Sequence, residues 1–271
     1  MDTDTLLRVA LAAAADAREV HLRHLGRVRP GDAVEKGAVD FVSHVDHEAE
    51  ARIVGRIRAS FPDHGILAEE GGADPGGAAG ASGASEWLWV IDPLDGTTNY
   101  LHGYPAFAVS IAAFRSGVGV VGVVAAPATG ETWTAARGQG AFRNGQPIRV
   151  SGIDSLRSAL IGTGFPFKAL DRLPAYLRQF DRVLRSTAGI RRAGSAALDL
   201  CHVASGYFDG FWELVLAPWD VAAGALIVRE AGGAVTRLDG GPVGLETGSL
   251  LAGNPRMHAE LGAILNQVND L

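Results

Sequence analysis

The stretch Asp92-Pro93-Leu94-Asp95-Gly96-Thr97-Thr98-Asn99-Tyr100 carries the most informative pattern in this chain. It directly follows the apolar run Trp87–Ile91, which predicts a buried strand. Two carboxylates therefore flank a Pro-Leu turn at a strand end, where a scaffold holds side chains rigidly yet leaves them reachable. Asp, Gly and Thr also favour helix starts, so we expect backbone N–H groups here to face an anion.

Three further carboxylates stand at similar positions. Glu69-Glu70 follow the short apolar strand Ile66–Ala68, and Asp220 opens an otherwise apolar helix. Each of these features alone is commoner as a turn or a solvated loop, but their joint occurrence favours a site. Clustered carboxylates repel one another unless cations neutralise them, and their hard oxygens suit Mg²⁺. Several carboxylates sharing ions fit a two-metal site for phosphoryl hydrolysis.

Composition sets the class of protein. The chain has 271 residues, of which 47% are hydrophobic and 20% charged, with a net charge of −6. These values argue against disorder and coiled coil, and the length is ample for burying a core. Because there is no basic excess, we expect no nucleic-acid partner. The single cysteine, Cys201, excludes an internal disulfide and a cysteine-cluster metal site.

Targeting and membrane signals are weak. The start Met1-Asp2-Thr3-Asp4 lacks the positive segment of a signal peptide. The longest apolar stretches, such as Val118–Ala126, are far shorter than the roughly 20 residues of a membrane helix. The sequence therefore predicts a cytoplasmic protein with no membrane partner.

The order of predicted elements indicates a layered fold. Apolar spacing predicts helices at residues 4–25, 46–60, 171–187, 194–205, 218–231 and 255–268. Strands are expected at residues 66–68, 87–91, 106–114, 118–125, 131–136, 159–162 and 207–213, with a hairpin turn at Asn144-Gly145. Residues 71–85, rich in Gly and Ala, are predicted to form a flexible loop. Helices and antiparallel strands without regular βαβ alternation are typical of an α+β fold.

Several other patterns have ordinary structural interpretations. Gly117–Gly122 satisfies G-x-G-x-x-G but opens no helix, so a turn and strand are expected there. His44 and His47 lack a third nitrogen or sulfur ligand nearby, which favours exposed loop histidines. His21 and His24 share a helix face that we expect to lie at the surface.

Residues 92–100 resemble the first signature of the inositol monophosphatase family. Trp219-Asp220-Val221-Ala222-Ala223-Gly224, continuing through Glu230-Ala231-Gly232-Gly233, resembles the second. The segments that also match the family, in order, are Lys36, Asp40–Asp46, Glu69-Glu70 and Gly194–Leu200. The resemblance covers nearly the whole chain. It implies the five-layer αβαβα sandwich of inositol monophosphatase and fructose-1,6-bisphosphatase, usually assembled as a homodimer.

The resemblance also implies how the chain is organised. Residues 1–271 would form a single unit. Its half 1–150 would bind metal and phosphate, and its half 151–271 would contribute substrate contacts and Asp220. Arg191-Arg192, just before Gly194, are compatible with a second phosphate, a partner subunit or a solvated role.

The resemblance implies a metal site position by position. Glu69, Asp92 and the backbone carbonyl of Leu94 are expected to bind the first Mg²⁺. Asp92, Asp95 and Asp220 are expected to bind a second. A third, weaker Mg²⁺ would sit near Glu69, and Mn²⁺ could substitute. The metal count would therefore be two to three per subunit.

Catalytic and substrate roles follow from the same resemblance. Glu69, Thr97 and Asp95 are the expected catalytic residues, and Thr97 and Glu69 would orient the attacking water. The backbone N–H groups of Gly96 and Thr97 would hold the phosphate. The residues expected to contact the hydroxyls of a sugar or cyclitol are Gly194, Ser195, Ala196 and Glu213. Lys36 and Asp46 match family positions on a loop and near the metals.

These roles imply a Mg²⁺-dependent, Li⁺-sensitive phosphomonoesterase that hydrolyses myo-inositol monophosphate by in-line attack of water. One alternative is the same fold acting on fructose 1,6-bisphosphate, histidinol phosphate or 3′-phosphoadenosine 5′-phosphate. Thr98-Asn99 argues against the last of these substrates, because family members that act on nucleotides typically carry Asp-Gly-Thr-Lys-Glu or a similar variant at this place. Glu213 supports a contact with the hydroxyl groups of a polyol. A second alternative, of a different class, is a relative with an additional non-catalytic regulatory role in transcription.

Overall fold

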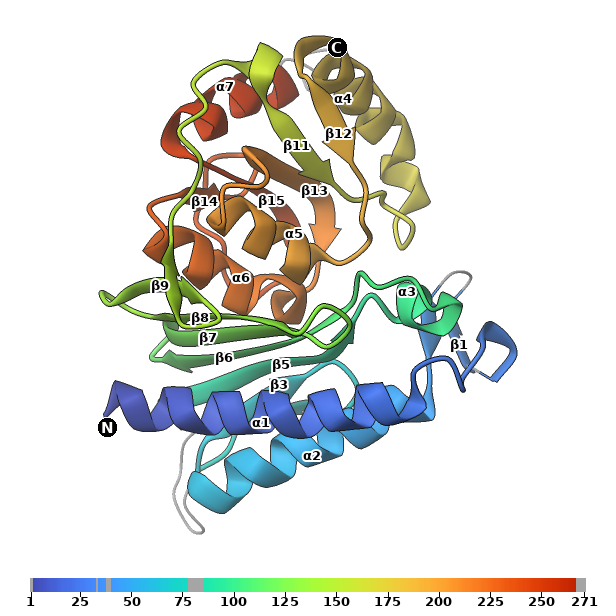
Figure 1. The fold of residues 1–271 in the computed structure, drawn as a ribbon, viewed down its shortest axis with the longest axis vertical. Helices are drawn as coiled ribbons and strands as arrows, with labels where there is room; N and C mark the ends of the chain where they lie inside the picture. Colours follow the sequence, from blue (N-terminus) through green and yellow to red (C-terminus); the bar gives the residue numbers. More distant parts are fainter. Residues whose placement is uncertain (1, 33, 38–39, 78–84, 267–271) are drawn as a thin grey trace.

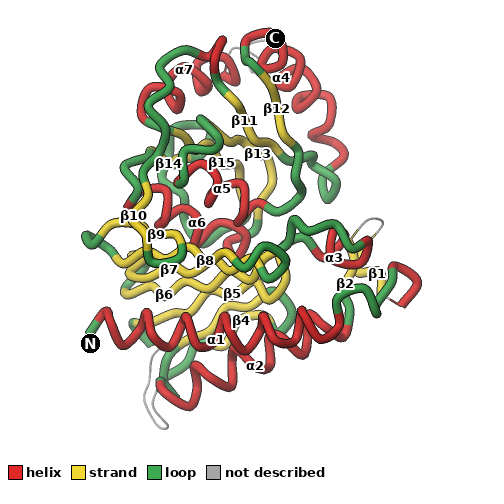
Figure 2. The backbone as a smooth tube through the Cα atoms, viewed as in Figure 1, coloured by secondary structure: helices red, strands yellow, loops and turns green. Residues whose placement is uncertain are grey.

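Five layers of helices and sheets make up the protein, seen edge-on in Figure 1. The computed structural model describes residues 2–32, 34–37, 40–77 and 85–266. Pairs of helices form the two outer layers and the middle layer, and a sheet lies in each of the two spaces between them, as Figure 2 shows. In layer order the helices are α1 (Thr3–His24) with α2 (His44–Ser60), α5 (Ala196–Ala204) with α6 (Pro218–Glu230), and α4 (Leu173–Ser186) with α7 (Pro255–Asn266). The predicted αβαβα sandwich of the α+β class is confirmed.

The larger sheet has eight strands and is mostly antiparallel, apart from the parallel pair β3 and β5. In spatial order its strands are β10 (Gln146–Ile148), β9 (Gly140–Arg143), β8 (Glu131–Ala136), β7 (Val118–Ala126), β6 (Ala108–Arg115), β5 (Trp87–Asp95), β3 (Gly65–Ala68) and β4 (Gly72–Asp74). Asn144, with φ of 49°, and Gly145 turn the predicted hairpin between β9 and β10. The G-x-G-x-x-G segment lies in the turn before β7 and in β7 itself, as expected.

The smaller sheet has five strands, and β11 pairs in parallel with both of its neighbours. Its strands, in spatial order, are β12 (Gly189–Arg191), β11 (Leu160–Thr163), β13 (Gly210–Leu216), β15 (Gly248–Gly253) and β14 (Ala234–Thr236). The remaining elements are the short helix α3 (Thr97–His102), the ribbon of β1 (Val34–Gly37) and β2 (Asp40–Val42), and the 3₁₀ turns Pro30–Asp32, Leu156–Ser158 and Leu170–Arg172. Within the described residues, no helix has the length and apolar character needed to cross a bilayer.

Strand alternation divides the apolar side chains between the layers. In β5, Trp89 and Ile91 pack toward α1 and α2, whereas Val90 packs toward α5 and α6. In β13, Trp212 packs toward α4 and α7, whereas Phe211 faces the middle layer. Because successive strand residues point to opposite faces, each sheet serves two cores at once. Burial of each such side chain stabilises the fold by about 1.5–3 kcal/mol.

Helix α1 buries a continuous stripe, and His21 belongs to it. His21 follows Ala17 by four residues and is fully buried, with its ring 6.0 Å from that of Tyr100 and 6.2 Å from that of Phe107. The prediction that His21 lies at the surface was therefore wrong. His24 is half-buried and lies 3.2 Å from Glu48 of α2. Burial lowers the pKa of His21 to about 4, so its ring is neutral at pH 7.

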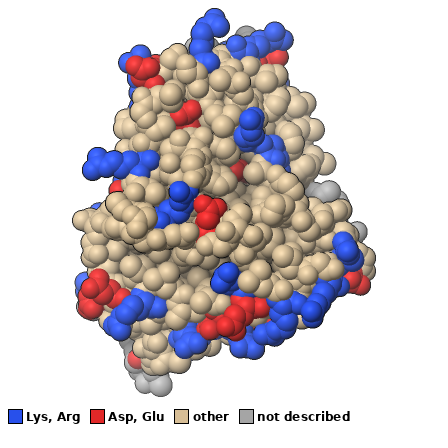
Figure 3. Space-filling view, viewed as in Figure 1, with Lys and Arg blue, Asp and Glu red and all other residues tan. Residues whose placement is uncertain are grey.

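The outer face of α1 and α2 carries charges of both signs, visible at the bottom of Figure 3. Ion pairs join the two helices, with 2.9 Å between Arg23 and Glu48 and 2.8 Å between Arg56 and Asp16. Such exposed pairs contribute little to stability individually. They do give this layer a mixed surface rather than a basic one.

Some elements differ from the predictions. Helix α2 begins at His44 because Ser43 and Asp46 form a capping box, so His44 and His47 are exposed on a helix rather than a loop. The predicted loop 71–85 contains β4, and its residues 78–84 lie outside the described residues. The three-residue strands β12 and β14, and β15, were not predicted from sequence.

Candidate functional site

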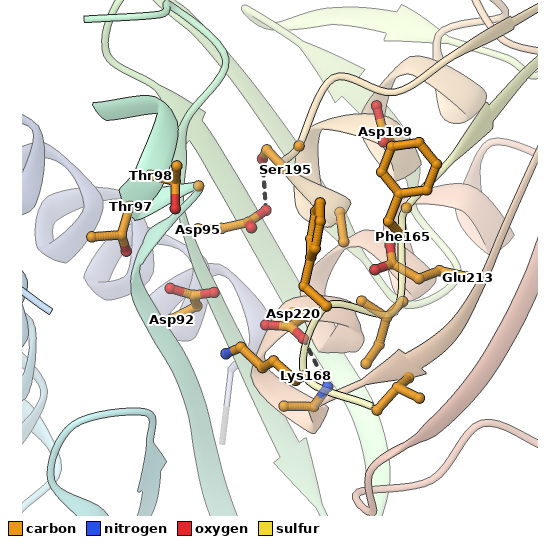
Figure 4. A pocket seen from close by; sticks show the side chains of 18 of the residues that line it. Asp92, Asp95, Thr97, Thr98, Phe165, Lys168, Ser195, Asp199, Glu213 and Asp220 are labelled. Carbon is orange, nitrogen blue, oxygen red and sulfur yellow. Dashed lines mark hydrogen bonds between the residues drawn. The ribbon is translucent and has the colours of Figure 1, made fainter. Parts of the chain in front are cut away.

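A pocket lies where the two sheets and the middle helix layer meet, and Figure 4 shows it closely. Its wall is built from the end of β5 with α3, the segment after β11, the starts of α5 and α6, and β13. Segments from both halves of the chain therefore contribute. Every residue that the resemblance assigned to metal, phosphate or substrate lines it: Glu69, Asp92, Leu94, Asp95, Gly96, Thr97, Gly194, Ser195, Ala196, Glu213 and Asp220.

An irregularity in β5 creates the acidic end of the pocket. The pairing of β5 with β6 breaks register between Asp92 and Asp95. Asp92 is buried, and its Oδ1 accepts a hydrogen bond of 3.0 Å from the backbone N–H of Leu94, which fixes the Pro-Leu turn. Bulges of this kind bend a strand and redirect its side chains. As a result, Asp92 and Asp95 both line the same pocket.

Asp95 is held by the start of α5, which comes from the other half of the chain. Its Oδ2 accepts hydrogen bonds from Ser195 Oγ at 2.6 Å and from the backbone N–H of Ala197 at 2.7 Å. Asp220 is held by its own helix start, because its Oδ2 accepts from the backbone N–H of Ala217 at 2.7 Å. Both carboxylates are thus oriented by helix N-termini, which favour negative charge.

The acidic groups interact strongly. Burial raises the pKa of Asp92 well above its usual value, and repulsion from Glu69, Asp95 and Asp220 raises it further. Burial, with repulsion from Asp95, raises the pKa of Asp220 to about 7. Burial also raises the pKa of Asp95, although its hydrogen bonds from α5 oppose that shift. Buried carboxylates that repel one another in this way gain stability from a nearby cation.

The donor set fits a hard divalent cation. Carboxylate oxygens of Glu69, Asp92, Asp95 and Asp220 line one pocket, and burial together with repulsion from the other three raises the pKa of Asp92. In the part of the chain that the structure describes, no three acidic, histidine or cysteine side chains already stand at coordination spacing. The fit is therefore one of donor chemistry and burial, because carboxylate oxygens are the ligands of hard divalent cations such as Mg²⁺ and Ca²⁺.

Thr97 connects the pocket to a buried carboxylate of α2. Its Oγ1 lies 3.0 Å from Asp46 Oδ1 and 3.0 Å from the carbonyl oxygen of Leu94. Asp46 is buried and also accepts from the Ser43 hydroxyl at 2.7 Å. The resemblance implied that Asp46 lies near the metals but gave it no role. In the structure, Asp46 accepts a hydrogen bond from the hydroxyl of Thr97.

Gly96, at the start of α3, is required by its backbone. It has φ of 92°, a conformation that residues other than glycine rarely adopt. A Cβ atom at this position would lie 2.8 Å from the carbonyl oxygen of Ala106. The backbone can therefore approach the pocket here only with glycine.

The other end of the pocket contains Glu213 of β13. Its carboxylate packs against the backbone of Gly164, where a Cβ atom would lie only 2.0 Å from Glu213 Oε2. Burial raises the pKa of Glu213 well above its usual value, with a further contribution from Asp220. Ser195 and Gly194 line the wall nearby, but the Ser195 hydroxyl is directed to Asp95.

Some pocket residues had no assigned role in the sequence analysis. These are chiefly Phe165, Lys168, Asp199 and Trp219, and Arg192, whose role was left open, also lines the pocket. Asp199 was part of a matched segment, and Lys168 is one of only two lysines, but neither signal pointed to the pocket. Lys36 lies in β1, and its side chain is outside the described residues.

The comparison with known proteins identifies the family to which this chain belongs. The model of the inositol monophosphatase family matches residues 2–270. The chain belongs to the inositol monophosphatase family.

Two curated relatives and one solved structure illustrate the similarity. The chain is 49% identical to "Nus factor SuhB" of Pseudomonas aeruginosa, over 93% of this chain and 92% of the relative. It is 43% identical to "Inositol-1-monophosphatase" of Rhizobium meliloti, over 98% of both chains. The crystal structure of extragenic suppressor protein suhB from Bartonella henselae superposes with a TM-score of 0.91 at 41% identity, covering 97% of this chain and 99% of that one. Relatives of this family member therefore carry both a phosphatase name and a Nus-factor name.

Proposed function

We propose that this family member is a Mg²⁺-dependent phosphomonoesterase that hydrolyses myo-inositol monophosphate to myo-inositol and phosphate. The observation that carries the proposal is the convergence of Glu69, Asp92, Asp95 and Asp220 on one pocket whose opposite end holds Glu213. Carboxylates at one end suit metal-assisted phosphate chemistry, and a carboxylate at the other suits hydroxyl groups. The inositol-1-monophosphatase name of a relative 43% identical supports the choice of substrate.

The carboxylates are the proposed metal ligands. Glu69, Asp92 and the carbonyl of Leu94 would hold one Mg²⁺, and Asp92, Asp95 and Asp220 a second, with a weaker third near Glu69. When bound, the ions supply positive charge that favours ionised water and stabilises the leaving oxygen. Without them, burial and mutual repulsion raise the pKa values of Asp92 and Asp220, which favours the protonated form of each carboxyl group.

Other residues of the chain position the reacting groups. Thr97 Oγ1 would accept a hydrogen bond from the attacking water, while its own hydroxyl donates a hydrogen bond to Asp46. Glu69 shares the task of orienting that water. The backbone N–H groups of Gly96 and Thr97 stand at the start of α3, which suits phosphate oxygens. Because phosphoryl transfer asks mainly for positioning and charge neutralisation, no covalent intermediate is needed.

The substrate end completes the proposal. Glu213 accepts from hydroxyls of the cyclitol, while Gly194, Ser195 and Ala196 shape the wall against it. Cys201 is buried in α5 and takes no part, since burial raises the pKa of its thiol well above the usual value. We further propose that residues 1–271 work as a single unit, as a cytoplasmic homodimer.

A second candidate function rests on a separate observation. A relative 49% identical over 93% of this chain is named a Nus factor. We propose as the second candidate an additional, non-catalytic role in transcription. It does not conflict with the phosphatase proposal, because the acidic residues of the pocket are all present in this chain. An Asp95→Asn variant separates the two roles, because a cellular phenotype that survives loss of phosphatase activity belongs to the second.

The test is phosphate release from a substrate panel, with and without Mg²⁺ and with Li⁺ added. The panel contains inositol 1-phosphate, fructose 1,6-bisphosphate, histidinol phosphate, 3′-phosphoadenosine 5′-phosphate and β-glycerophosphate. We expect Mg²⁺-dependent, Li⁺-inhibited turnover that is fastest on inositol 1-phosphate. Faster turnover of another ester would replace the substrate and keep the reaction. No turnover by folded protein would overturn the proposal.

A further inference from the structure

Asp199 is a buried carboxylate at the pocket for which neither the proposed metal site nor the fold provides a full set of partners. It lies in the first turns of α5 and lines the pocket, with only 2% of its surface exposed. Its Oδ1 is buried, and no hydrogen-bond donor among the described residues reaches it. Leaving a buried carboxylate oxygen without a donor is costly, so a native fold rarely keeps one without a reason.

The nearby cation does not satisfy Asp199. The guanidinium of Arg192 lies over the rings of Phe165 and Phe167, 5.3 Å and 5.2 Å from their centroids. Among the described residues, Arg192 forms no ion pair with Asp199, although its charge acts on it at longer range. Stacking on two aromatic rings holds a guanidinium in place. Asp199 therefore has an acceptor, Oδ1, that no described residue uses, on a side chain that lines the pocket.

The position of Asp199 indicates what that group is. Figure 4 shows Asp199 and Glu213 on one side of the pocket, with Asp92 and Thr97 on the other. The two carboxylates come from different elements, α5 and β13. Carboxylates accept hydrogen bonds only, so neighbouring hydroxyl groups are the matching donors. A phosphate held near Thr97 would leave the hydroxylated part of its ester on the side of Asp199.

We propose that Asp199 is a further substrate-binding residue, which accepts a hydrogen bond from a second hydroxyl of the polyol beside the one held by Glu213. This inference rests on the proposed phosphomonoesterase function and extends it to specificity. A site built to bond two hydroxyls disfavours an ester that lacks them, because its buried acceptors then stay unpaired. Asp199 thereby helps the pocket select polyol phosphates over simple esters.

The test compares two substrates in variants of one residue. Asp199→Leu removes the acceptor at similar size, and Asp199→Asn weakens it with the same shape. The substrates are inositol 1-phosphate and p-nitrophenyl phosphate, which carries no hydroxyl. We expect kcat/KM for inositol 1-phosphate to fall at least tenfold in Asp199→Leu, mainly through KM, and less in Asp199→Asn. The value for p-nitrophenyl phosphate should change by less than threefold.

The deciding quantity is the selectivity ratio, which is kcat/KM for inositol 1-phosphate divided by kcat/KM for p-nitrophenyl phosphate. His202→Gln changes a residue of the same helix that does not line the pocket, and should leave the ratio unchanged. Equal losses on both substrates would mean that Asp199 only supports the fold or the acidic end, and would overturn the proposal. So would an unchanged ratio. If the leucine variant does not fold, the asparagine variant decides. Absence of inositol 1-phosphate turnover in the unmodified protein would instead reject the underlying function.

Discussion

Ser195 Oγ lies 2.6 Å from Asp95 Oδ2, and this hydrogen bond joins residues one hundred positions apart in the sequence. Asp95 ends β5 in the N-terminal half, whereas Ser195 caps α5 in the C-terminal half. The backbone N–H of Ala197 donates to the same oxygen at 2.7 Å. The orientation of one acidic residue of the pocket therefore depends on how the two halves pack.

Removing this hydroxyl should affect both stability and activity. We expect Ser195→Ala to lower the free energy of unfolding by about 1–2 kcal/mol, since it loses a helix cap and a hydrogen bond to a carboxylate. Phosphate release should fall at least tenfold, because Asp95 loses the only side-chain donor among the hydrogen bonds from the start of α5 that orient it. Chemical denaturation and initial rates measure the two effects. Ser155→Ala is the control, as Ser155 is exposed and makes no capping hydrogen bond. A drop in stability with full activity would contradict the link.

Thr97 and Asp46 should behave as a unit. Thr97→Val removes the hydroxyl that lies 3.0 Å from Asp46, and Asp46→Asn removes its charged acceptor. If the pair orients the attacking water, each variant should lower kcat by tenfold or more, and the double variant should be little slower than the slower single one. The coupling in a double-mutant cycle is expected at about 1–3 kcal/mol. Independent, additive losses would show that the two residues do not act through each other.

Metal binding should depend on pH in a defined direction. The pKa of Asp220 is about 7, far above that of an unfolded aspartate, and that of Asp92 is also raised. Between the unfolded and folded pKa values the folded protein binds more protons, so the metal-free protein loses stability as pH rises from about 4 to 7. Mg²⁺ competes with those protons and should recover that loss.

The measurement is the thermal midpoint with and without saturating Mg²⁺. The increase caused by Mg²⁺ should be larger at pH 8 than at pH 6. In Asp220→Asn, which lacks the titrating group, the difference between the two pH values should shrink. A larger increase at pH 6 would refute the proton–metal competition.

His21 should destabilise the protein in acid. Its folded pKa of about 4 lies below the unfolded value, so the unfolded state binds more protons between pH 6.5 and 4, and stability falls as pH falls through that range. The contribution from pH 7 to pH 5 is about 2 kcal/mol. Relative to the unmodified protein, His21→Leu should lose about that much less stability over this interval. His47→Gln, on an exposed residue, should follow the unmodified protein. Parallel curves for the unmodified protein and His21→Leu would exclude a buried neutral His21.

Much of the fold could be predicted from local patterns. The long elements α1, β6, β7 and α6 have clear periodicity, and the structure places them close to the predicted bounds. Short strands carry too few residues for a periodic signal, so β12 and β14 were missed. His21 was misplaced because its residue type suggested a surface, although its spacing from Ala17 continued the buried stripe.

The residues of the site also divide into those that local sequence patterns reveal and those that they do not. Carboxylates at strand ends and helix starts, such as Asp92 and Asp220, could be found from sequence because their positions are unusual. The pairing of Thr97 with Asp46 joins positions 51 residues apart, and nothing local in the sequence encodes it. Arg192 and Asp199 reach the pocket only because β12 pairs with β11, next to β13, and α5 packs against β13. Tertiary packing supplied these contacts.

The most direct test of the central claim is phosphate release from inositol 1-phosphate by the unmodified protein and by Asp92→Asn, each with and without Mg²⁺. Asp92 is buried among the other acidic groups and would be a ligand to both ions. We predict turnover that requires Mg²⁺ in the unmodified protein and falls by at least a hundredfold in the folded variant. Turnover without Mg²⁺, or turnover that survives in Asp92→Asn, would contradict the assignment of this pocket to metal-assisted phosphate hydrolysis.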